Sequence, residues 1–319
     1  MKTRIPRRWF QFSLRTFLIA LTALAVWLGI EVNRVRRQRE AVAAILAAGG
    51  KVLYDYQLYD YQNVLRKSFT PDAEPAAPRW LRKIIGEDFF RDVIDVDLNR
   101  THITDEWLRR LNDLPKIENL NLAYTPITDA GIESLAKLGC LKRVTLDETR
   151  VTDRSLAHLA QVSPELTMLG IGGPGVTDEG LSEIARFERL QKLFLSNAAI
   201  TDAGLRHLEK LGELELLWLA VAPITDRGLE SVTRLHQLKR LFLLELQVSD
   251  AGVQRLDAMP FLQRLAITQA PITDAGVERL KQLKWLRQLD LHDTHVTDAA
   301  AADLASAMPM CKITTVPPP

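Results

Sequence analysis

Cysteine is nearly absent from this chain, and its scarcity excludes two common ways of stabilising a fold. Only Cys140 and Cys311 occur among 319 residues. The sequence repeat described below separates them by seven strand spacings of about 4.8 Å, or about 34 Å, whereas a disulfide needs Cα atoms within about 7 Å. No His stands at metal-ligand spacing from either cysteine, so we expect neither a disulfide nor a structural zinc site.

An excess of charge of one sign is lacking over most of the chain. The formal net charge is +1, from 41 Lys and Arg against 40 Asp and Glu. Residues 1–40 hold nine basic and two acidic side chains, a local balance of +7, which leaves −6 for the remainder. A mildly acidic body does not offer the basic surface that nucleic acid requires, so no nucleic-acid partner is expected.

Recognisable catalytic machinery is also missing. The glycine-rich segment 170–175 is not followed by the Lys-Ser/Thr pair of a phosphate-binding loop. His292 and His295 flank Asp293 without an evident third metal ligand. Since no nucleophile, base and orienting group stand together, we expect no enzymatic activity, no cofactor and no metal site.

One long uncharged run lies near the N-terminus. Residues 16–30 carry no charge, but as a helix they span only about 22 Å against a bilayer core of about 30 Å. Residues 10–32 give 23 positions and about 34 Å, with Arg15 reaching toward the headgroups. The sequence therefore predicts an N-terminal membrane anchor over residues 1–32, which crosses the membrane once through residues 10–32.

A cleaved signal peptide is the alternative to this anchor. Ala23-Leu24-Ala25 has the small-x-small form of a cleavage site, but it lies inside the apolar run rather than before a polar flank. An uncleaved anchor is therefore favoured. Five basic residues precede the run and four follow it, which places the N-terminus in the cytoplasm and the rest of the chain on the extracytoplasmic side.

A short motif then repeats through the chain. [Ile/Val]-[Thr/Ser]-Asp occurs nine times at intervals of 24 residues, with a single interval of 25. The copies begin at Ile103, Ile127, Val151, Val176, Ile200, Ile224, Val248, Ile272 and Val296. A fixed period between about 20 and 50 residues is typical of a solenoid.

The segment 190–211 shows what one repeat contains. Leu193 and Leu195 alternate as on one face of a short strand. Asp202 stands where a helix N-cap is expected, and it is followed at a spacing of three by Leu205, Leu208 and Leu211. Each repeat is thus predicted to be a strand, a turn and a short helix. Stacking would build a parallel sheet on the concave face and helices on the convex face.

This pattern, L-x-x-L-x-L-x-x-[T/A]-x-x-I-T-D-x-G-L, resembles the leucine-rich repeat superfamily, and most closely its ribonuclease-inhibitor-like and F-box-associated branches. The resemblance covers residues 91–316 and implies an α/β leucine-rich repeat solenoid, here preceded by one transmembrane helix. Residues 12–18, F-S-L-R-T-F-L, are similar to the anchor of bacterial membrane-tethered leucine-rich repeat proteins. The motif is specific for fold and not for function.

Residues 33–90 are interpreted as a linker helix and an N-terminal capping module. The helix is expected to end at Gly49-Gly50, with a strand over 51–57 and a second helix over 80–86. A cap is needed because the first repeat would otherwise expose an unpaired strand edge. Residues 312–316 are expected to add a last strand before a tail over 317–319.

The outward strand positions vary from repeat to repeat, and three adjacent repeats carry large rings there. Because the leucines occupy the alternate, inward positions, these side chains are expected to be open to solvent. An apolar patch rimmed by cations is typical of a binding hot spot. The predicted partner-binding residues are Lys192, Phe194, Leu216, Trp218, Arg240, Phe242, Leu244 and Arg264.

The sequence thus favours a non-enzymatic, membrane-anchored protein that binds a macromolecule, most readily a protein, on its concave face. One alternative is an intracellular F-box-like substrate-selecting adaptor, although residues 1–90 contain no recognisable F-box segment. Another is a cell-surface glycan-binding module that uses the rings as stacking platforms, although carboxylate and amide ligands are absent from those repeats. The patch could also contact a second copy of the chain or be covered by the cap.

Overall fold

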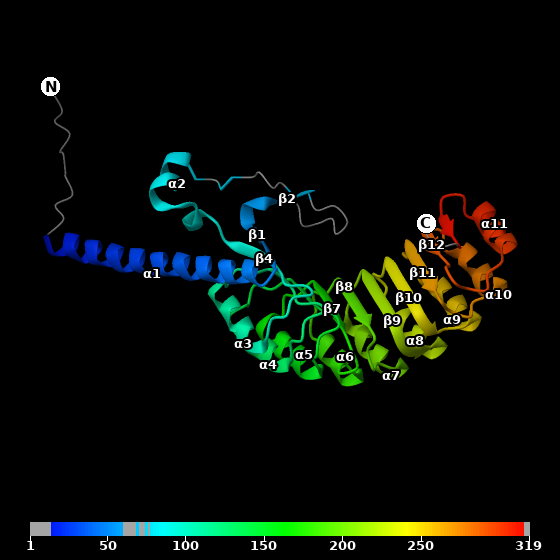
Figure 1. Ribbon diagram of the computed structural model, residues 1–319. Helices are drawn as coiled ribbons and strands as arrows, with labels where there is room; N and C mark the ends of the chain where they lie inside the picture. The colour runs from blue at the N-terminus through cyan, green and yellow to red at the C-terminus, as the bar shows by residue number, and fades with distance from the viewer. Residues whose placement is uncertain (1–13, 60–67, 70–73, 76, 316–319) are drawn as a thin grey trace, which may run out of the picture.

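The computed structural model describes residues 14–59, 68–69, 74–75 and 77–315. A long N-terminal helix, α1 (Leu14–Ala47), leads into a curved ribbon of strands with short helices along its outer side (Figure 1). The predicted solenoid with an inner sheet and outer helices is therefore confirmed.

One sheet of eleven strands runs the length of the arc in the order β1, then β4 through β13. Apart from β1, neighbouring strands pair in parallel and in register. The parallel strands are β4 (Val93–Asp97), β5 (Asn119–Asn121), β6 (Arg143–Leu146), β7 (Met168–Gly172), β8 (Lys192–Ser196), β9 (Leu216–Thr225), β10 (Arg240–Gln247), β11 (Arg264–Thr268), β12 (Gln288–Asp290) and β13 (Lys312–Thr314).

The interior is a single apolar core between the sheet and the convex helices. Leu193 and Leu195 are fully buried, as the alternation predicts, while Lys192 and Ser196 face outward. The helices that close the core are α3 (Asp105–Leu108), α4 (Asp129–Glu133), α5 (Asp153–Val162), α6 (Asp178–Ile184), α7 (Asp202–Leu205), α8 (Asp226–Val232), α9 (Asp250–Gln254), α10 (Asp274–Val277) and α11 (Asp298–Ala307). Four of them continue into 3₁₀ turns, η3 (Arg109–Asp113), η4 (Arg206–Lys210), η5 (Arg255–Ala258) and η6 (Glu278–Gln282).

The start of each convex helix differs from the prediction by one residue. The N-cap of α7 is Thr201, whose hydroxyl accepts a hydrogen bond from the Ala203 N–H, and Asp202 is the first helical residue. The assignment of Asp202 as N-cap is therefore wrong. Its carboxylate is already occupied, since it accepts hydrogen bonds from the backbone N–H and the hydroxyl of Thr225 at 2.8 and 2.6 Å.

The same two bonds join the motifs of successive repeats into a ladder. They recur from Asp105 and Thr128 at one end to Asp274 and Thr297 at the other. Each carboxylate thus satisfies a backbone donor at the next helix terminus, one of the groups that helices leave unpaired. We call this row of Asp–Thr and Asp–Ser contacts the aspartate ladder; it connects the repeats along the edge where the convex helices begin.

The ladder also explains the glycine of the D-x-G motif. A Cβ added at Gly204 would lie 2.2 Å from the Asp178 Oδ1 of the preceding repeat, so this position has no room for a larger side chain. One repeat carries Ser155 there, and its hydroxyl donates to Asp129 at 2.5 Å. Burial alone would raise the pKa of Asp129, but the hydrogen bonds from Ser155 and Thr152 outweigh burial and hold the pKa below its ordinary value.

A left-handed residue follows the outward positions of each inner strand. Its φ lies between 51° and 59° in eight repeats, and in the repeat with the extra residue Gly173 takes its place with φ 110°. In the same repeat a Cβ at Gly172 would come within 2.3 Å of the Ser196 carbonyl oxygen. The glycine-rich segment therefore accommodates the insertion and the close approach of β8; it is not a phosphate-binding loop.

The N-terminal cap covers the first repeat. β1 (Lys51–Tyr54) pairs antiparallel with β4 and so protects the sheet edge. The second half of α1 packs against the same repeat through the buried side chains of Val35, Gln38, Ala41 and Ile45. The remaining cap elements are η1 (Asp55–Gln57), β2 (Leu58–Tyr59), β3 (Ser68–Phe69), α2 (Arg79–Ile85) and η2 (Glu87–Phe90). The other residues of the expected loop over 70–78 lie largely outside the described part of the chain.

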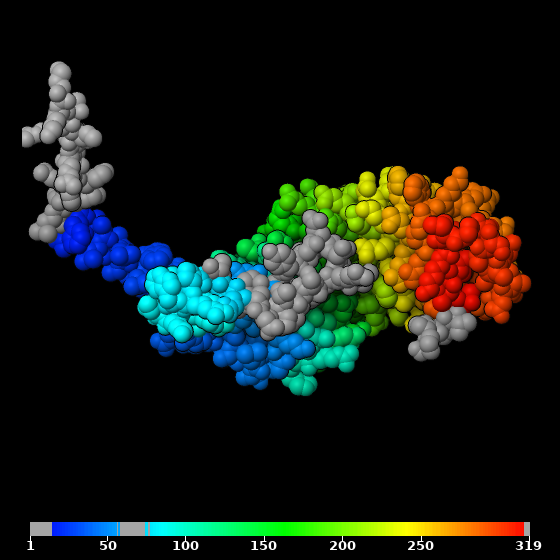
Figure 2. Space-filling model, turned by 90° about the horizontal axis from the view of Figure 1, so that it is seen from above, coloured from blue at the N-terminus to red at the C-terminus, as the bar shows by residue number. Residues whose placement is uncertain are grey.

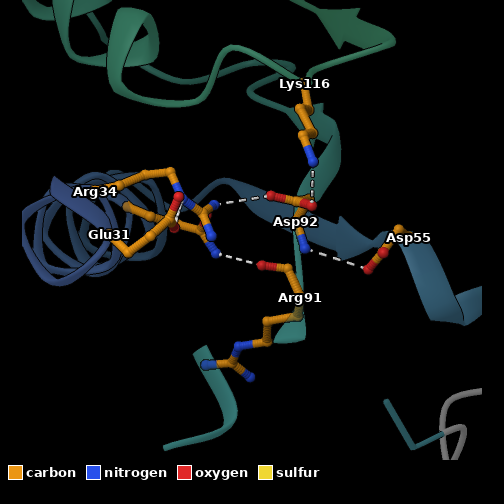
Figure 3. A network of polar contacts seen from close by, with 7 residues as sticks. Glu31, Arg34, Asp55, Arg91, Asp92 and Lys116 are labelled. Atoms are coloured by element: carbon orange, nitrogen blue, oxygen red, sulfur yellow. Dashed lines mark hydrogen bonds and ion pairs between the residues drawn. The ribbon is translucent and has the colours of Figure 1, made fainter. Parts of the chain in front are cut away.

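A polar network centred on Asp92 fixes α1 to this cap (Figure 3). The Arg34 guanidinium donates to Glu31 at 2.7 Å and to Asp92 at 3.0 Å. Lys116, from the first repeat, lies 2.7 Å from the same Asp92 carboxylate, and the Asp92 N–H donates to Asp55 at 3.2 Å. Helix α1 therefore enters the repeat body directly, without an intervening loop.

The first half of α1 contacts nothing among the described residues. Phe17, Leu24 and Trp27 are 58%, 57% and 57% exposed. By length and composition α1 is apolar enough to cross a membrane. Residues 10–13 of the predicted span lie outside the described part of the chain.

Candidate functional site

The concave face is organised in columns. Because each strand pairs in register with the next, the side chains at equivalent outward positions line up across the sheet. The middle column runs through Asp97, Asn121, Thr145, Gly170, Phe194, Trp218, Phe242, Ala266 and Asp290. The face is therefore polar at its two ends and aromatic in between.

Three rings of this column stack on one another. The Trp218 and Phe242 centroids are 4.8 Å apart at 28°, and those of Phe194 and Trp218 are 6.3 Å apart at 36°. The shorter distance equals the spacing of adjacent strands, so the register itself places one ring on the next. We call the resulting cluster the concave patch; it comprises Phe194, Leu216, Trp218, Phe242, Leu244 and Ala266.

The rings are less exposed than the sequence predicts. Leu216 and Phe242 are only 5% and 8% exposed, and Phe194, Trp218 and Leu244 are half-buried. The expectation that all these side chains are open to solvent is therefore wrong. They are not in the interior, however: they form a cluster separate from the core. Phe242 is covered from its own face of the sheet, by Trp218 on one side and by the Arg264 guanidinium 5.0 Å from its ring centroid.

Cationic side chains follow the patch along the first outward column, where Lys192, Leu216, Arg240 and Arg264 are paired in register. Within the described residues neither Lys192 nor Arg240 forms an ion pair. Arg264 lies 3.5 Å from the Asp290 carboxylate, but its Nε is buried and finds no acceptor there.

The electrostatics of Lys192 show that this border is short of negative charge. Burial is the main cause that lowers its pKa, and the nearby Arg240 and Arg143 lower it further, against the opposing effect of Glu215. The sequence-based set of binding residues did not include Arg143. Its signal was available, because Arg143 occupies the same column two repeats before Lys192.

The N-terminal part of the concave face is hydrogen-bonded within itself. A shallow hollow of about 230 Å³ lies there. Along its wall the Asn119 amide donates to Asp95 at 2.9 Å, and Arg143 Nε donates to the Asn119 carbonyl oxygen at 2.6 Å. The hollow is lined by Asp95, Asp97, Asn119, Leu120, Asn121, Arg143, Thr145 and Met168.

Asp147 lies between the polar hollow and the concave patch. Burial raises the pKa of this carboxyl, and a 3.1 Å hydrogen bond from the Ser196 hydroxyl opposes the rise only in part. Sequence reasoning gave Asp147 no role. It becomes buried because the neighbouring strands carry Gly170 and Gly172, whose absent side chains let β7 approach closely.

Metal-ligating groups do not gather anywhere in the described part of the chain: no three His, Cys, Asp or Glu side chains are placed to hold an ion. Cys140 is exposed, Cys311 is buried, and both are free thiols.

Comparison with known proteins agrees with the architecture. Residues 114–136 match a family model described as leucine-rich repeat. Together with the ladder, the parallel inner sheet and the 24-residue period, this match defines the chain as a leucine-rich repeat protein. Modules of this fold are protein-interaction repeats.

No curated protein matches the chain. Similar solved structures include an internalin of Listeria monocytogenes, with a TM-score of 0.49 and 18% identity over 75% of this chain and 88% of that one. Internalin C2 of the same organism has a TM-score of 0.46 and 23% identity, over 65% and 84%. A leucine-rich repeat protein of Leptospira interrogans has a TM-score of 0.44 and 17% identity, over 64% and 62%. Similarity at this level carries no information on function.

Proposed function

We propose that this protein is a non-enzymatic, membrane-anchored interaction module whose concave patch binds a segment of a protein partner that carries both apolar and acidic side chains. The observation that carries the proposal is an apolar cluster outside the interior core, bordered by cations without ionic partners.

The geometry favours a protein segment as the occupant. The half-buried edges of Phe194, Trp218 and Leu244 remain available for apolar contact, and aromatic side chains are the commonest hot-spot residues. Lys192 and Arg240 beside them would be neutralised by carboxylates, which gives orientation and specificity to the contact. Because the rings are already stacked, little side-chain entropy remains to be lost on binding.

The anchor is proposed on the properties of α1. Its first half is apolar and uncovered, which suits lipid better than water. The basic residues that precede the span outnumber those that follow it, so the repeats are proposed to lie on the extracytoplasmic side. Digestion of the repeats by protease added to intact cells is expected; protection of the repeats would support the intracellular adaptor instead.

The glycan-binding alternative is less consistent with the patch. A sugar stacks on the face of an aromatic ring, but both faces of Phe242 are occupied, by Trp218 and by Arg264. The rings are thus arranged to contact one another, and they offer edges rather than open platforms.

The decisive variant is Trp218→Ala, compared with Trp285→Ala as a matched control. Trp285 is 56% exposed and lies outside the concave columns, between the η6 turn and β12. A partner is first identified by cross-linking in native membranes, and its affinity is then measured with purified proteins. Trp218→Ala is expected to weaken binding by about 2 kcal/mol, roughly thirtyfold, and Trp285→Ala to leave it unchanged. An affinity that does not respond to Trp218→Ala, or that falls equally with both variants, contradicts the proposal.

A further inference from the structure

Helix α2 of the cap presents an uncovered apolar face. Trp80 is 64% exposed, Ile84 is 74% exposed and Ile85 is 40% exposed. Trp80 and Ile84 are four residues apart and so lie on the same side of the helix, with the exposed Lys83 beside them. Isolated apolar side chains on a surface are ordinary, but two large ones side by side on a seven-residue helix need a partner.

The charges of α2 suit an anionic layer. Its three charged residues, Arg79, Arg82 and Lys83, are all basic. Arg82 is buried and pairs with Glu74, which also pairs with Arg79 at 3.0 Å. Lys83 forms no ion pair with any residue that the structure describes. Tryptophan, aliphatic side chains and lysine on one helix are typical of a segment that lies in the membrane interface.

The cap holds α2 close to the point where α1 would leave the membrane. Gly86 joins α2 to η2, and η2 is tied to α1 by the ion pair between Asp88 and Arg39. Arg39 is seven residues beyond Val32, about 10 Å along the helix. Ile85 is three residues before Asp88, which spans at most about 10 Å.

These distances bring α2 within reach of the headgroup layer, which is roughly 5 to 7 Å thick on each side of the hydrocarbon core. Figure 1 shows α2 beside α1 and displaced from the solenoid toward the N-terminal end of that helix. In Figure 2 it lies at the same level along α1. The second face of the cap therefore points to the membrane and not to the repeats.

We propose that α2 lies in the lipid headgroup layer beside α1, with Trp80 and Ile84 at the boundary of the hydrocarbon and Arg79 and Lys83 near lipid phosphates. This contact rests on the proposed membrane anchoring and extends it. One spanning helix leaves a body free to tilt and rotate on the membrane; a second contact point fixes both motions. The concave patch would then face its partner in one orientation.

Lipid contact is tested with the full chain reconstituted into phosphatidylcholine vesicles, with and without phosphatidylglycerol. In a background of Cys140→Ser and Cys311→Ala, one cysteine at a time carries a polarity-sensitive fluorophore. The labelled variants are Ile84→Cys in α2, Leu24→Cys in α1 and Phe261→Cys, a 55% exposed apolar position of the far repeats. Each is quenched by a lipid with a nitroxide near its headgroup.

The label at position 84 is expected to lose most of its fluorescence, as the label at position 24 does, while the label at position 261 keeps its fluorescence. The loss at position 84 is expected to be greater with phosphatidylglycerol, because the nearby side chains are cationic. Quenching at 24 without quenching at 84 overturns this inference and leaves the anchor standing. Absence of quenching at both positions overturns the anchor as well.

Two other occupants of this face have their own signatures. A blue-shifted but unquenched label at position 84 would show that protein, a second copy or a partner, covers α2, and would overturn the inference. Equal quenching at positions 84 and 261 would show unspecific adsorption of the whole body, with the same consequence.

Discussion

Two edges of each repeat obey opposite rules. Along the aspartate ladder every repeat places nearly the same residues in the same contacts, from Asp105 and Thr128 to Asp274 and Thr297. Along the concave face equivalent positions carry an aspartate in one repeat, a glycine in another and a tryptophan in a third. The two surfaces are built on the same period, but only the ladder is repeated chemically.

The difference separates stability from recognition. A ladder contact joins two neighbouring repeats, so its loss weakens an interface of the kind on which solenoid stability depends. A concave side chain contacts its neighbours on the same face and leaves the core unchanged. Changes at the ladder should therefore unfold the protein without selecting among ligands, whereas changes at the concave patch should alter binding in a folded protein.

The largest effect is expected from Asp202→Ala, which breaks the ladder in the middle of the arc. The variant leaves the Thr225 N–H and hydroxyl without their acceptor, and a buried donor that loses its partner costs about 1 to 3 kcal/mol. We expect the free energy of unfolding to fall by about 2 kcal/mol, measured by urea unfolding of the purified protein in detergent.

Asp298→Ala provides the matched control for this prediction. Asp298 has the same place at the start of α11, but its side chain accepts no hydrogen bond from the described residues. Its loss removes only the favourable interaction of a carboxylate with a helix N-terminus, about 0.3 to 1 kcal/mol. Equal destabilisation by the two variants would mean that the ladder contacts add nothing beyond the helix dipole.

A smaller effect, with opposite signs for binding and for stability, is expected from Lys192→Met. Burial and the neighbouring Arg240 and Arg143 already lower the pKa of Lys192, so the folded protein is stabilised, or at least not weakened, when the charge is removed. Binding of an acidic partner should weaken by about 1 kcal/mol, roughly fivefold, and should depend less on salt than in the parent. Titration calorimetry at two ionic strengths, with the exposed Lys137→Met as control, measures both changes. A gain in affinity would exclude an acidic segment as the occupant.

The smallest effect concerns Asp147, at the boundary between the polar hollow and the concave patch. Its pKa is raised by burial, so the protonated form is favoured by folding; this contribution is present below the unfolded pKa and is lost as the pH rises through the folded pKa. Asp147→Asn cannot titrate and still accepts from Ser196. The variant should therefore be more stable than the parent at neutral pH, and its advantage should shrink as the pH falls through the carboxyl range. Paired urea titrations from neutral to acidic pH measure this difference, and a constant difference would contradict the assigned pKa direction.

Several features of the ladder could have been predicted from the sequence and were not. The Asp and the Thr that it binds are 23 or 24 residues apart, and the glycine of D-x-G recurs with the same period. N-cap preference alone cannot distinguish Thr201 from Asp202, because both side chains cap helices well. Only the position of the next repeat shows that the carboxylate is already used there.

The extent of ring burial was equally beyond the sequence. Alternation correctly predicts that Phe194, Trp218 and Phe242 point away from the core. It does not predict that Trp218 and Phe242 stack at 4.8 Å, or that Arg264 covers the remaining face of Phe242. These contacts depend on side-chain rotamers across neighbouring strands, and a pattern along one strand contains no information about them.

The sequence by itself determined the period, the inward and outward faces of every strand and the change of chemistry along the concave side, because these follow from a residue's place within one repeat. The tertiary structure decided which groups remain unsatisfied: the aspartates are occupied by the next repeat, the rings by one another, and Lys192 and Arg240 by no described residue. It also brought α2 beside α1, although 31 residues separate them in the chain. Such pairings arise only when distant segments pack together, since hydrogen bonding and burial depend on neighbours in space and not on neighbours in sequence.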